Sequence, residues 1–230
     1  MTPLSKLPNF DPHRVPVLGV DAHLPAIAPD QLQAAALQRR FANPPHWHPE
    51  LVIEHKFADR LPAHASVLVP LIMHARPSVL LTERTAHLST HSGQVAFPGG
   101  KADEGDEDAA ATALREAHEE VGLDERFIEV IGTLPIYTTG TSFIVTPVVA
   151  LVTPGFVLRP NPDEVADAFE VPLDFLMNPA NHRRHAFEWE GVRREWFSMP
   201  YTDPAGGSPE RFVWGATAGM LRNFYRFLAA

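Results

Sequence analysis

Three glutamates within five residues are the part of this sequence best suited to chemistry. They are Glu116, Glu119 and Glu120, and they follow a glycine pair, Gly99 and Gly100. A helix turns about 100° per residue, so Glu116 and Glu120 share one flank and Glu119 lies one step further out. Carboxylates at that spacing repel by roughly 0.2–0.5 kcal/mol per pair in water, and by more in a cleft. A divalent cation would relieve this repulsion, and an all-oxygen ligand set suits Mg²⁺ or Mn²⁺ better than zinc.

A solvated acidic face is the alternative interpretation of a bare Glu-x-x-Glu-Glu pattern. The residues around it favour a metal site, because the same segment carries an apolar stripe and a stop signal. Arg115 stands beside the first glutamate, and Gly122 ends the helical pattern. The stripe consists of Ala110, Ala113, Leu114, Ala117 and Val121. We therefore predict a helix over 107–121 that buries the stripe and presents the acids beside it.

The segment 101–123 resembles the Nudix signature, G-x5-E-x7-R-E-U-x-E-E-x-G-U, in which U is a bulky aliphatic residue. The positions that match are Glu107, Arg115, Glu116, Glu119, Glu120, Gly122 and Leu123. Lys101 stands at the first glycine position, and the small Ala117 stands at the middle U. Counted from Gly100 instead, the first acid is Asp106, with one extra residue before Arg115.

An upstream motif makes the chain similar to the coenzyme A pyrophosphatase branch of this superfamily. The motif runs over 80–85 and again over 91–100, and the whole resemblance covers roughly residues 65 to 228. Two positions depart from the branch: Thr85 stands where it usually has Ser or Ala, and Ser89 where it usually has Arg. Arginine is a natural phosphate ligand, so the second departure bears on the substrate more than on the reaction.

The resemblance implies metal-dependent hydrolysis of a pyrophosphate linkage. Its expected substrate is coenzyme A or an acyl derivative, cleaved to 3′,5′-ADP and (acyl-)4′-phosphopantetheine. ADP-ribose or a dinucleotide polyphosphate is the alternative within this class, and a non-catalytic nucleotide-binding module is the alternative of another class. The metal, Mg²⁺ or Mn²⁺, would be held by Glu116, Glu119 and Glu120. The three intact acids favour an enzyme, because a decayed relative would be free to lose them.

Two further residues around the signature have two interpretations each. Arg115 can orient the acids through an ion pair with Glu119 at i+4, or it can contact the substrate, and we favour orientation. Glu107 is either a support of the metal site or an acid favoured by the helix dipole. The resemblance supports the structural role of Arg115, since in the family this arginine holds the helix against its loop.

The substrate-binding candidates lie upstream of the acids. Gly99 and Gly100 would let the backbone approach the metal site, although a tight turn alone would also require glycine. Arg84 and Lys101 are candidates for binding phosphate, with ordinary surface salt bridges as the alternative.

The catalytic base has two candidates. Glu164 belongs to a loop that resembles the Asn-x-x-Glu-Val pattern of the branch and has no evident packing role, so we favour it. The alternatives are Glu119, which would activate water from the helix, and a Glu164 that is merely solvated. His182 and His185 are expected at the surface, because neither cysteine nor adjacent acids accompany them.

Composition limits the function classes. The chain has 230 residues, 45% of them apolar, enough for one large domain or a domain plus an arm. It has no cysteine, which excludes disulfides, thiolate zinc sites and a thiol nucleophile. A net charge of −9 argues against nucleic acid but not against a small anionic nucleotide substrate, because bound cations reverse the local field. Neither a membrane span nor a signal peptide is evident, so we expect a soluble, cytoplasmic protein without a membrane partner.

Two zones are expected along the chain. Residues 1–65 are rich in proline and form an arm with one helix over 30–42, capped by Asp30. We expect this arm, including His46 and His48, to pack on the main domain or on a second subunit, so a homodimer is possible. Residues 66–230 form the catalytic unit.

The second zone alternates strands and helices. A final amphipathic helix over 216–228 follows the strands. The expected strands are 66–73, 78–82, 94–97, 127–134, 143–152, 186–190 and 192–199. This order predicts an α/β fold with a mixed sheet between helical layers, and the resemblance implies a Nudix α/β/α sandwich.

Overall fold

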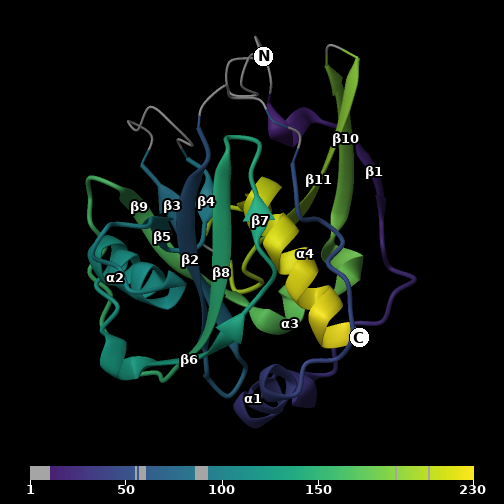
Figure 1. Ribbon diagram of the computed structural model, residues 1–230. Coiled ribbons are helices and arrows are strands. Elements are labelled where there is room, and N and C mark those ends of the chain that lie inside the picture. The colour runs from purple at the N-terminus through teal and green to yellow at the C-terminus, as the bar shows by residue number, and fades with distance from the viewer. Residues whose placement is uncertain (1–10, 55, 57–60, 86–92, 190, 207) are drawn as a thin grey trace.

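The computed structural model (Figure 1) describes residues 11–230 except 55, 57–60, 86–92, 190 and 207. Ser89, His91 and Ser92 of the upstream motif lie outside the described residues. The helices are α1 (Ala34–Ala42), α2 (Ala109–Val121), α3 (Leu173–Leu176) and α4 (Gly215–Ala229), with short 3-10 turns η2 (Pro12–Arg14), η3 (Pro29–Leu32), η4 (Glu125–Phe127) and η5 (Pro179–Asn181). None of the helices found in this part of the chain is long and apolar enough to cross a membrane.

The strands form two sheets. They are β1 (Val17–Val20), β2 (Ala63–Ile72), β3 (Ser78–Arg84), β4 (Val95–Ala96), β5 (Gly99–Lys101), β6 (Ile128–Thr133), β7 (Tyr137–Thr138), β8 (Phe143–Val152), β9 (Val165–Pro172), β10 (Arg183–Trp189), β11 (Val192–Tyr201) and β12 (Arg211–Trp214). The large sheet has the order β4-β3-β2-β8-β6, with β5 paired to β2, β7 to β8 and β9 to β3. Because β2 and β8 are parallel and the other pairs are antiparallel, the predicted α/β fold with a mixed sheet is confirmed.

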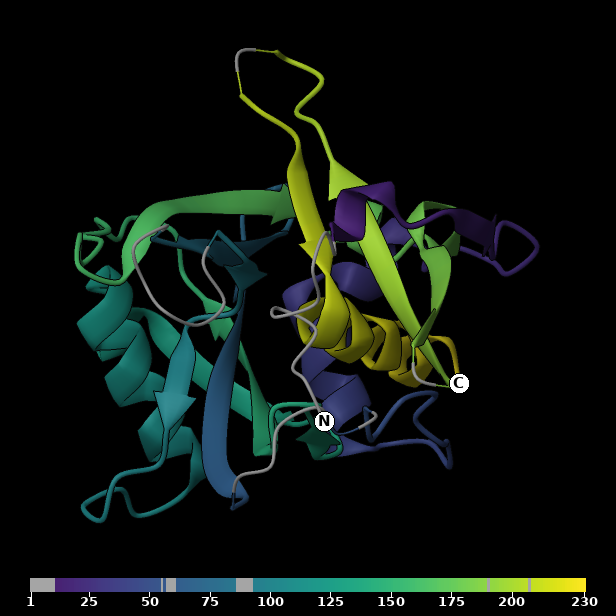
Figure 2. The same cartoon turned by 90° about the horizontal axis from the view of Figure 1, so that it is seen from above.

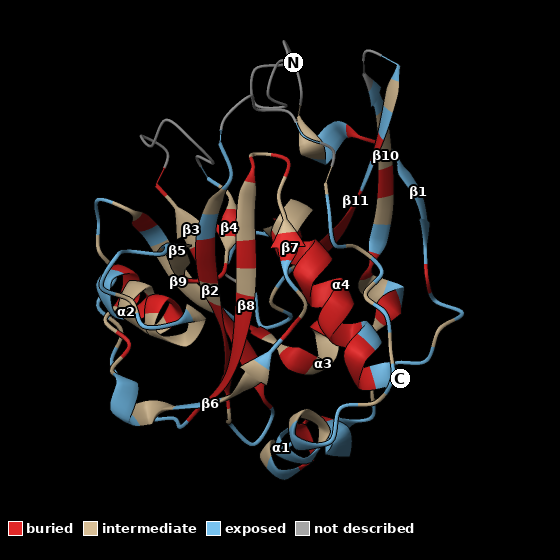
Figure 3. Cartoon of the chain, in the orientation of Figure 1, coloured by how far each residue is buried: buried red, intermediate tan, exposed pale blue. Residues whose placement is uncertain are grey.

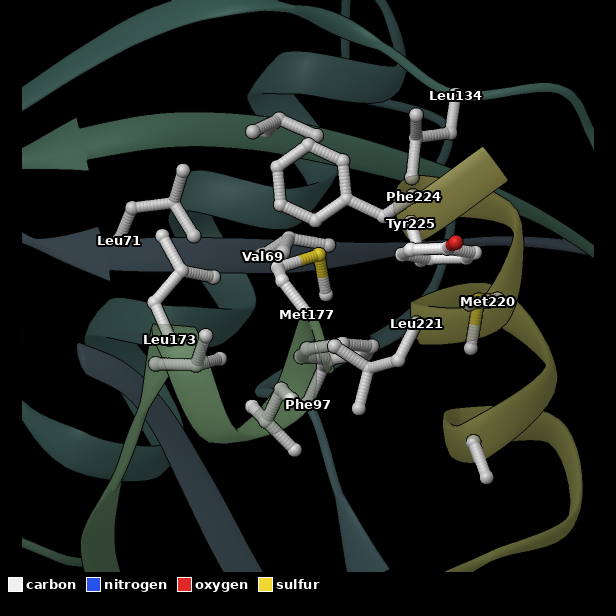
Figure 4. Close-up of a cluster of buried hydrophobic side chains, with 14 of the residues drawn as sticks. Val69, Leu71, Phe97, Leu134, Leu173, Met177, Met220, Leu221, Phe224 and Tyr225 are labelled. Carbon is white, nitrogen blue, oxygen red and sulfur yellow. The ribbon is translucent and has the colours of Figure 1, made fainter. Parts of the chain in front are cut away.

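The large sheet is buried on both faces. Leu68 and Ile72 of β2 pack with α2, whereas Val69 and Leu71 of the same strand face the core that contains α4. Figure 2 shows α2 and α4 on opposite sides of this sheet, and Figure 4 shows the α4 side, where Val69 lies near Phe224 and Leu71 lies near Leu173. Burial on both faces explains why β2 and β8 are apolar runs rather than alternating sequences. The bounds of β8 are those predicted.

Helix α4 is buried nearly all round, which differs from the predicted amphipathic helix. Figure 3 shows it almost wholly in the buried class. The large sheet covers one side of α4, and β11 and β12 of the small sheet, whose order is β1-β10-β11-β12, contact another. Only the β10–β11 hairpin of this small sheet was expected, and its remaining strands supply the cover that makes α4 internal.

The arm packs on its own chain. Leu32 and Leu37 are buried in the core that contains α4, and α1 contacts the edge strand β6, where Phe41 lies so close to Gly132 that a Cβ there would clash. Covering an edge strand protects its unpaired backbone groups. Asp30 does not cap α1 as predicted; it lies in η3, and α1 begins at Ala34. A boundary at residue 65 stays a prediction, as does a homodimer.

A partly buried ion network joins the arm to α4 and β10. Arg222 of α4 is 1% exposed and contacts Glu50 at 2.7 Å and Asp21 at 2.8 Å. Arg184 of β10 binds the same two acids, at 2.9 Å to Asp21 and 2.6 Å to Glu50. Burial alone would raise the pKa of Asp21, but the hydrogen bond from Arg184 and the charge of Arg222 hold it below its ordinary value.

His182 and His185 are buried, so the prediction that they lie at the surface is wrong. His182 donates from Nε2 to the Leu176 carbonyl at 2.7 Å and accepts at Nδ1 from Arg222 at 3.1 Å. Burial lowers the pKa of His182 to about 4, so it is neutral at physiological pH. His185 donates from Nδ1 to Val15 and accepts from Ser198. Both are structural histidines in the packing of β10.

We predict that Arg222→Met lowers the free energy of unfolding by about 3–5 kcal/mol, because it leaves the buried Asp21 without one of its counter-charges. Urea unfolding measures this change. Arg226→Met is the matched control on the same helix, since Arg226 is 43% exposed and 3.9 Å from Glu50, and it should cost about 0.5 kcal/mol or less. Equal losses in the two variants would contradict the network's importance.

Candidate active site

Helix α2 presents its acids as the periodicity predicts. Its N-terminus is capped by Asp108, which accepts from the Ala111 N–H at 2.8 Å, and it ends at Gly122 in the left-handed conformation with φ of 66°. The stripe of Ala113, Ala117 and Val121 packs against the large sheet. The side chains of the three glutamates become progressively more exposed, from 5% for Glu120 to 17% for Glu116 and 56% for Glu119.

The glycine pair in β5 lies directly against two of these carboxylates. The Gly99 N–H donates to Glu120 Oε2 at 3.1 Å. A Cβ at Gly100 would lie 2.5 Å from the Glu116 carboxyl group, and one at Gly99 would collide with the backbone of Ser66 and Val67. Only glycine therefore fits at Gly99, whereas a side chain at Gly100 would displace the Glu116 carboxylate; the close approach expected from the sequence is present.

Arg115 forms hydrogen bonds to the two more exposed glutamates of α2 and so fixes their orientation. Its guanidinium donates to Glu116 Oε1 and to Glu119 Oε2, each at 3.0 Å, so the predicted ion pair at i+4 is confirmed. It also makes a bidentate contact with Asp106 and donates to the Lys101 carbonyl at 3.0 Å. All of its nitrogens are occupied, which supports an orienting role for Arg115.

Asp106, not Glu107, is the acid that pairs with Arg115. Asp106 also accepts from the Asp103 N–H and the Thr112 hydroxyl, at 2.9 Å each. Glu107 precedes the cap residue of α2 and is exposed, so its predicted place in the first helical turn is wrong. Counting the signature from Gly100 identifies Asp106, and the extra residue is accommodated in the turn before α2.

Burial and neighbouring acids make Glu120 hard to ionise. Burial raises its pKa to about 7; the Gly99 N–H and the charge of Arg84 oppose this, while Glu116 and Glu164 add to it. Burial also raises the pKa of Glu116, and the charges of Glu119 and Glu164 contribute. The charge of Glu164 therefore acts on both Glu116 and Glu120, although Glu164 follows them by more than 40 residues in the sequence.

The positive side chains predicted to bind phosphate differ in their surroundings. Arg84, at the end of β3, places Nη1 3.5 Å from Glu120 Oε1 and is partly exposed. Lys101 is exposed at the end of β5. Arg84 thus lies beside the acids, and Lys101 is linked to them by its backbone contact with Arg115.

The loop that carries Glu164 is attached to the end of α2. The Arg159 N–H donates to the Val121 carbonyl and the Asn161 N–H donates to the Glu120 carbonyl, each at 2.8 Å. These contacts bring a segment that follows β8 back to the acids of α2. Sequence reasoning selected Glu164 from its motif but did not identify the contacts that place the loop here.

The acids could hold a metal only after a local rearrangement. No group of three or more His, Asp or Glu side chains in the described residues is arranged to hold a metal ion. Arg115 occupies oxygen atoms of Glu116 and Glu119, and Arg84 lies near Glu120. The donor set is nevertheless all oxygen, and the mutual repulsion of the acids favours a cation among them.

A separate cavity of about 390 Å³ lies over the small sheet, lined in part by Asp21, Glu50 and Arg184.

Comparison with known proteins gives three findings. The NUDIX domain family matches residues 62–198. The chain is 42% identical over 159 residues, 69% of its length and 79% of the relative's, to a Citrobacter koseri protein described as an uncharacterized Nudix hydrolase, NudL, and 41% identical over the same shares to the Escherichia coli K12 protein of that description. The crystal structure of a Nudix hydrolase from M. smegmatis, RenU, is 27% identical, with a TM-score of 0.43, and covers 56% of this chain and 80% of that one.

We predict that Asp106→Asn lowers the thermal unfolding midpoint and that the neighbouring Glu107→Gln leaves it unchanged. The hydrogen bond from Arg115 holds the pKa of Asp106 well below its ordinary value. Its stabilisation is therefore present above about pH 4 and is lost as the pH falls further. Calorimetry in EDTA as a function of pH measures this, and the two variants should converge below pH 4. Equal midpoints at neutral pH would refute the assignment of Asp106.

Proposed function

Because this chain belongs to the Nudix family and is a Nudix pyrophosphohydrolase, we propose that it cleaves the pyrophosphate linkage of coenzyme A or an acyl-coenzyme A. The products are 3′,5′-ADP and (acyl-)4′-phosphopantetheine. The upstream motif over 80–100 is the observation that supports this choice of substrate. Its described part includes β3, β4 and β5, which precede the acids of α2. The descriptions of the similar NudL proteins give no substrate, so the choice of substrate rests on this motif.

The proposed cofactor is Mg²⁺ or Mn²⁺, held by Glu116, Glu119 and Glu120. When bound, such an ion neutralises charge on the phosphates and makes water more acidic. The fit of these residues is supported by their oxygen donors and by the raised pKa values of Glu116 and Glu120, which burial and like charge produce. Arg115 positions Glu116 and Glu119, and we assign it this role rather than contact with the substrate.

The remaining residues have complementary roles in the proposal. Gly99 fixes Glu120 through its N–H, and Gly100 leaves room for Glu116. Arg84 and Lys101 bind the phosphates of the substrate. Without substrate, the nearest negative charge to Arg84 is the carboxylate of Glu120; with substrate bound, the phosphates take over this role. Glu164 accepts the proton from the attacking water, and the attachment of its loop to the end of α2 supports this role.

We predict that coenzyme A is hydrolysed with a kcat/KM about tenfold or more above that for ADP-ribose or a dinucleotide polyphosphate. The test is a substrate panel with Mg²⁺, with Mn²⁺ and with EDTA, in which products are separated by ion-exchange chromatography. The proposal requires 3′,5′-ADP as a product and no turnover in EDTA. Equal or better hydrolysis of ADP-ribose would overturn the substrate, and binding of coenzyme A without hydrolysis would identify a non-catalytic module.

We predict that Glu164→Gln lowers kcat by about 10²–10⁴, the range for loss of a general base, with little change in metal affinity. Asp163→Asn is the matched control, because this neighbouring acid is exposed on the same loop; it should retain kcat within about twofold. Steady-state kinetics and a Mn²⁺ titration give both quantities. If Glu119→Gln gives the large loss with metal still bound, and Glu164→Gln does not, the base lies on α2.

A further inference from the structure

The segment that ends in Glu164 is a tight turn built around Asn161. The Asn161 carbonyl accepts from the Glu164 N–H at 3.1 Å and from the Val165 N–H at 2.8 Å, and its side-chain oxygen accepts from the Asp163 N–H at 3.1 Å. The Asn161 N–H donates to the Glu120 carbonyl. One end of the turn is therefore attached to the residue that carries the most buried acid of α2.

The other end of the turn is attached to Thr85. The Thr85 N–H donates to the Glu164 carbonyl at 3.0 Å, and the Thr85 hydroxyl donates to the Asp163 carbonyl at 3.2 Å. Thr85 is 6% exposed. The pairing of β3 with β9 shifts register between Glu83 and Arg84, so Thr85 follows the end of the regular ladder and bonds the turn directly.

These two attachments set where the carboxylate of Glu164 can lie. The carbonyls of two successive peptides, those of Asp163 and Glu164, are bonded to Thr85, which lies 78 positions before Asp163 in the chain. Asn161 fixes the same turn relative to α2. Removing the Thr85 hydroxyl leaves the Asp163 carbonyl without this donor, so the peptide that precedes Glu164 is then held only through its N–H, by the Asn161 carbonyl.

We propose that Thr85 is a positioning residue for Glu164, holding the turn so that the Glu164 carboxylate keeps its orientation relative to the acids of α2. The inference rests on the proposed role of Glu164 as the base. Thr85 itself touches neither substrate nor metal. Its hydroxyl acts on the rate through the geometry of the turn, and a displacement of about 1 Å in a catalytic group can cost up to about 100-fold in rate.

The first test compares Thr85→Val, which keeps the shape and removes the hydroxyl, with Thr85→Ser, which keeps the hydroxyl. Thr85→Val should lower kcat about tenfold with KM changed less than about twofold, and Thr85→Ser should restore kcat to within about twofold of wild type. Thr82→Val is the matched control. Thr82 is a buried threonine like Thr85 but lies within β3, and its hydroxyl donates to the Ala96 carbonyl at 3.3 Å.

Thr82→Val should lower the unfolding midpoint about as much as Thr85→Val, while keeping wild-type kcat. If Thr82→Val lowers kcat as much as Thr85→Val does, the effect is one of general stability and the inference fails. If Thr85→Val retains wild-type kcat, the inference fails as well. If Thr85→Val does not fold, Thr85→Ala takes its place with the same expected loss of kcat and the same rescue by Thr85→Ser.

A double-mutant cycle separates this inference from the proposed function. In a Glu164→Gln background, Thr85→Val should change kcat less than about twofold, because the group that it positions is already gone. An equal loss in both backgrounds would overturn the positioning role and leave Glu164 as the base. A Glu164→Gln variant with wild-type kcat would instead overturn the proposed base, and the role of Thr85 with it. Kinetics on the substrate that the panel identifies give all four values.

Discussion

The structure depends on holding like-charged carboxylates together. Burial disfavours the ionisation of Glu116 and Glu120, and the neighbouring negative charges, that of Glu164 among them, add to the cost. The compensating groups are Arg115 from the same helix, Arg84 from β3 and the Gly99 N–H from β5. Since they come from three elements, the acids can be assembled only where α2 packs on the large sheet. The need to hold these acids therefore links the fold to the chemistry.

Local sequence patterns predicted the parts of this arrangement that have local causes. The helical period placed the stripe and the acids of α2, and Gly122 ends the helix because it adopts a conformation that glycine tolerates. The same patterns left two ways of counting the signature, and spacing could not decide between them. The choice depends on the turn that precedes α2, in which Asp106 meets both Arg115 and the Asp103 N–H.

Distant contacts explain what the patterns missed. His182 and His185 were predicted to lie at the surface because neither cysteine nor adjacent acids accompany them, yet they are buried against the distant Arg222 and Val15. Helix α4 was predicted to be amphipathic. Its second side is covered by β11 and β12 of the small sheet, and β12 was not predicted from the sequence. For the same reason, a family resemblance selected Glu164, whereas no local signal marks Thr85 as its partner.

The ion network of Asp21, Glu50, Arg184 and Arg222 has a consequence for the order of events during synthesis on the ribosome. Glu50 is translated 172 residues before Arg222, and Asp21 is translated 163 residues before Arg184. Until those arginines emerge, burial of the two acids would leave their charges uncompensated, so the early segment must remain hydrated. Large proteins commonly fold from the N-terminus as they are made; here the arm can dock only after β10 and α4 have left the exit tunnel.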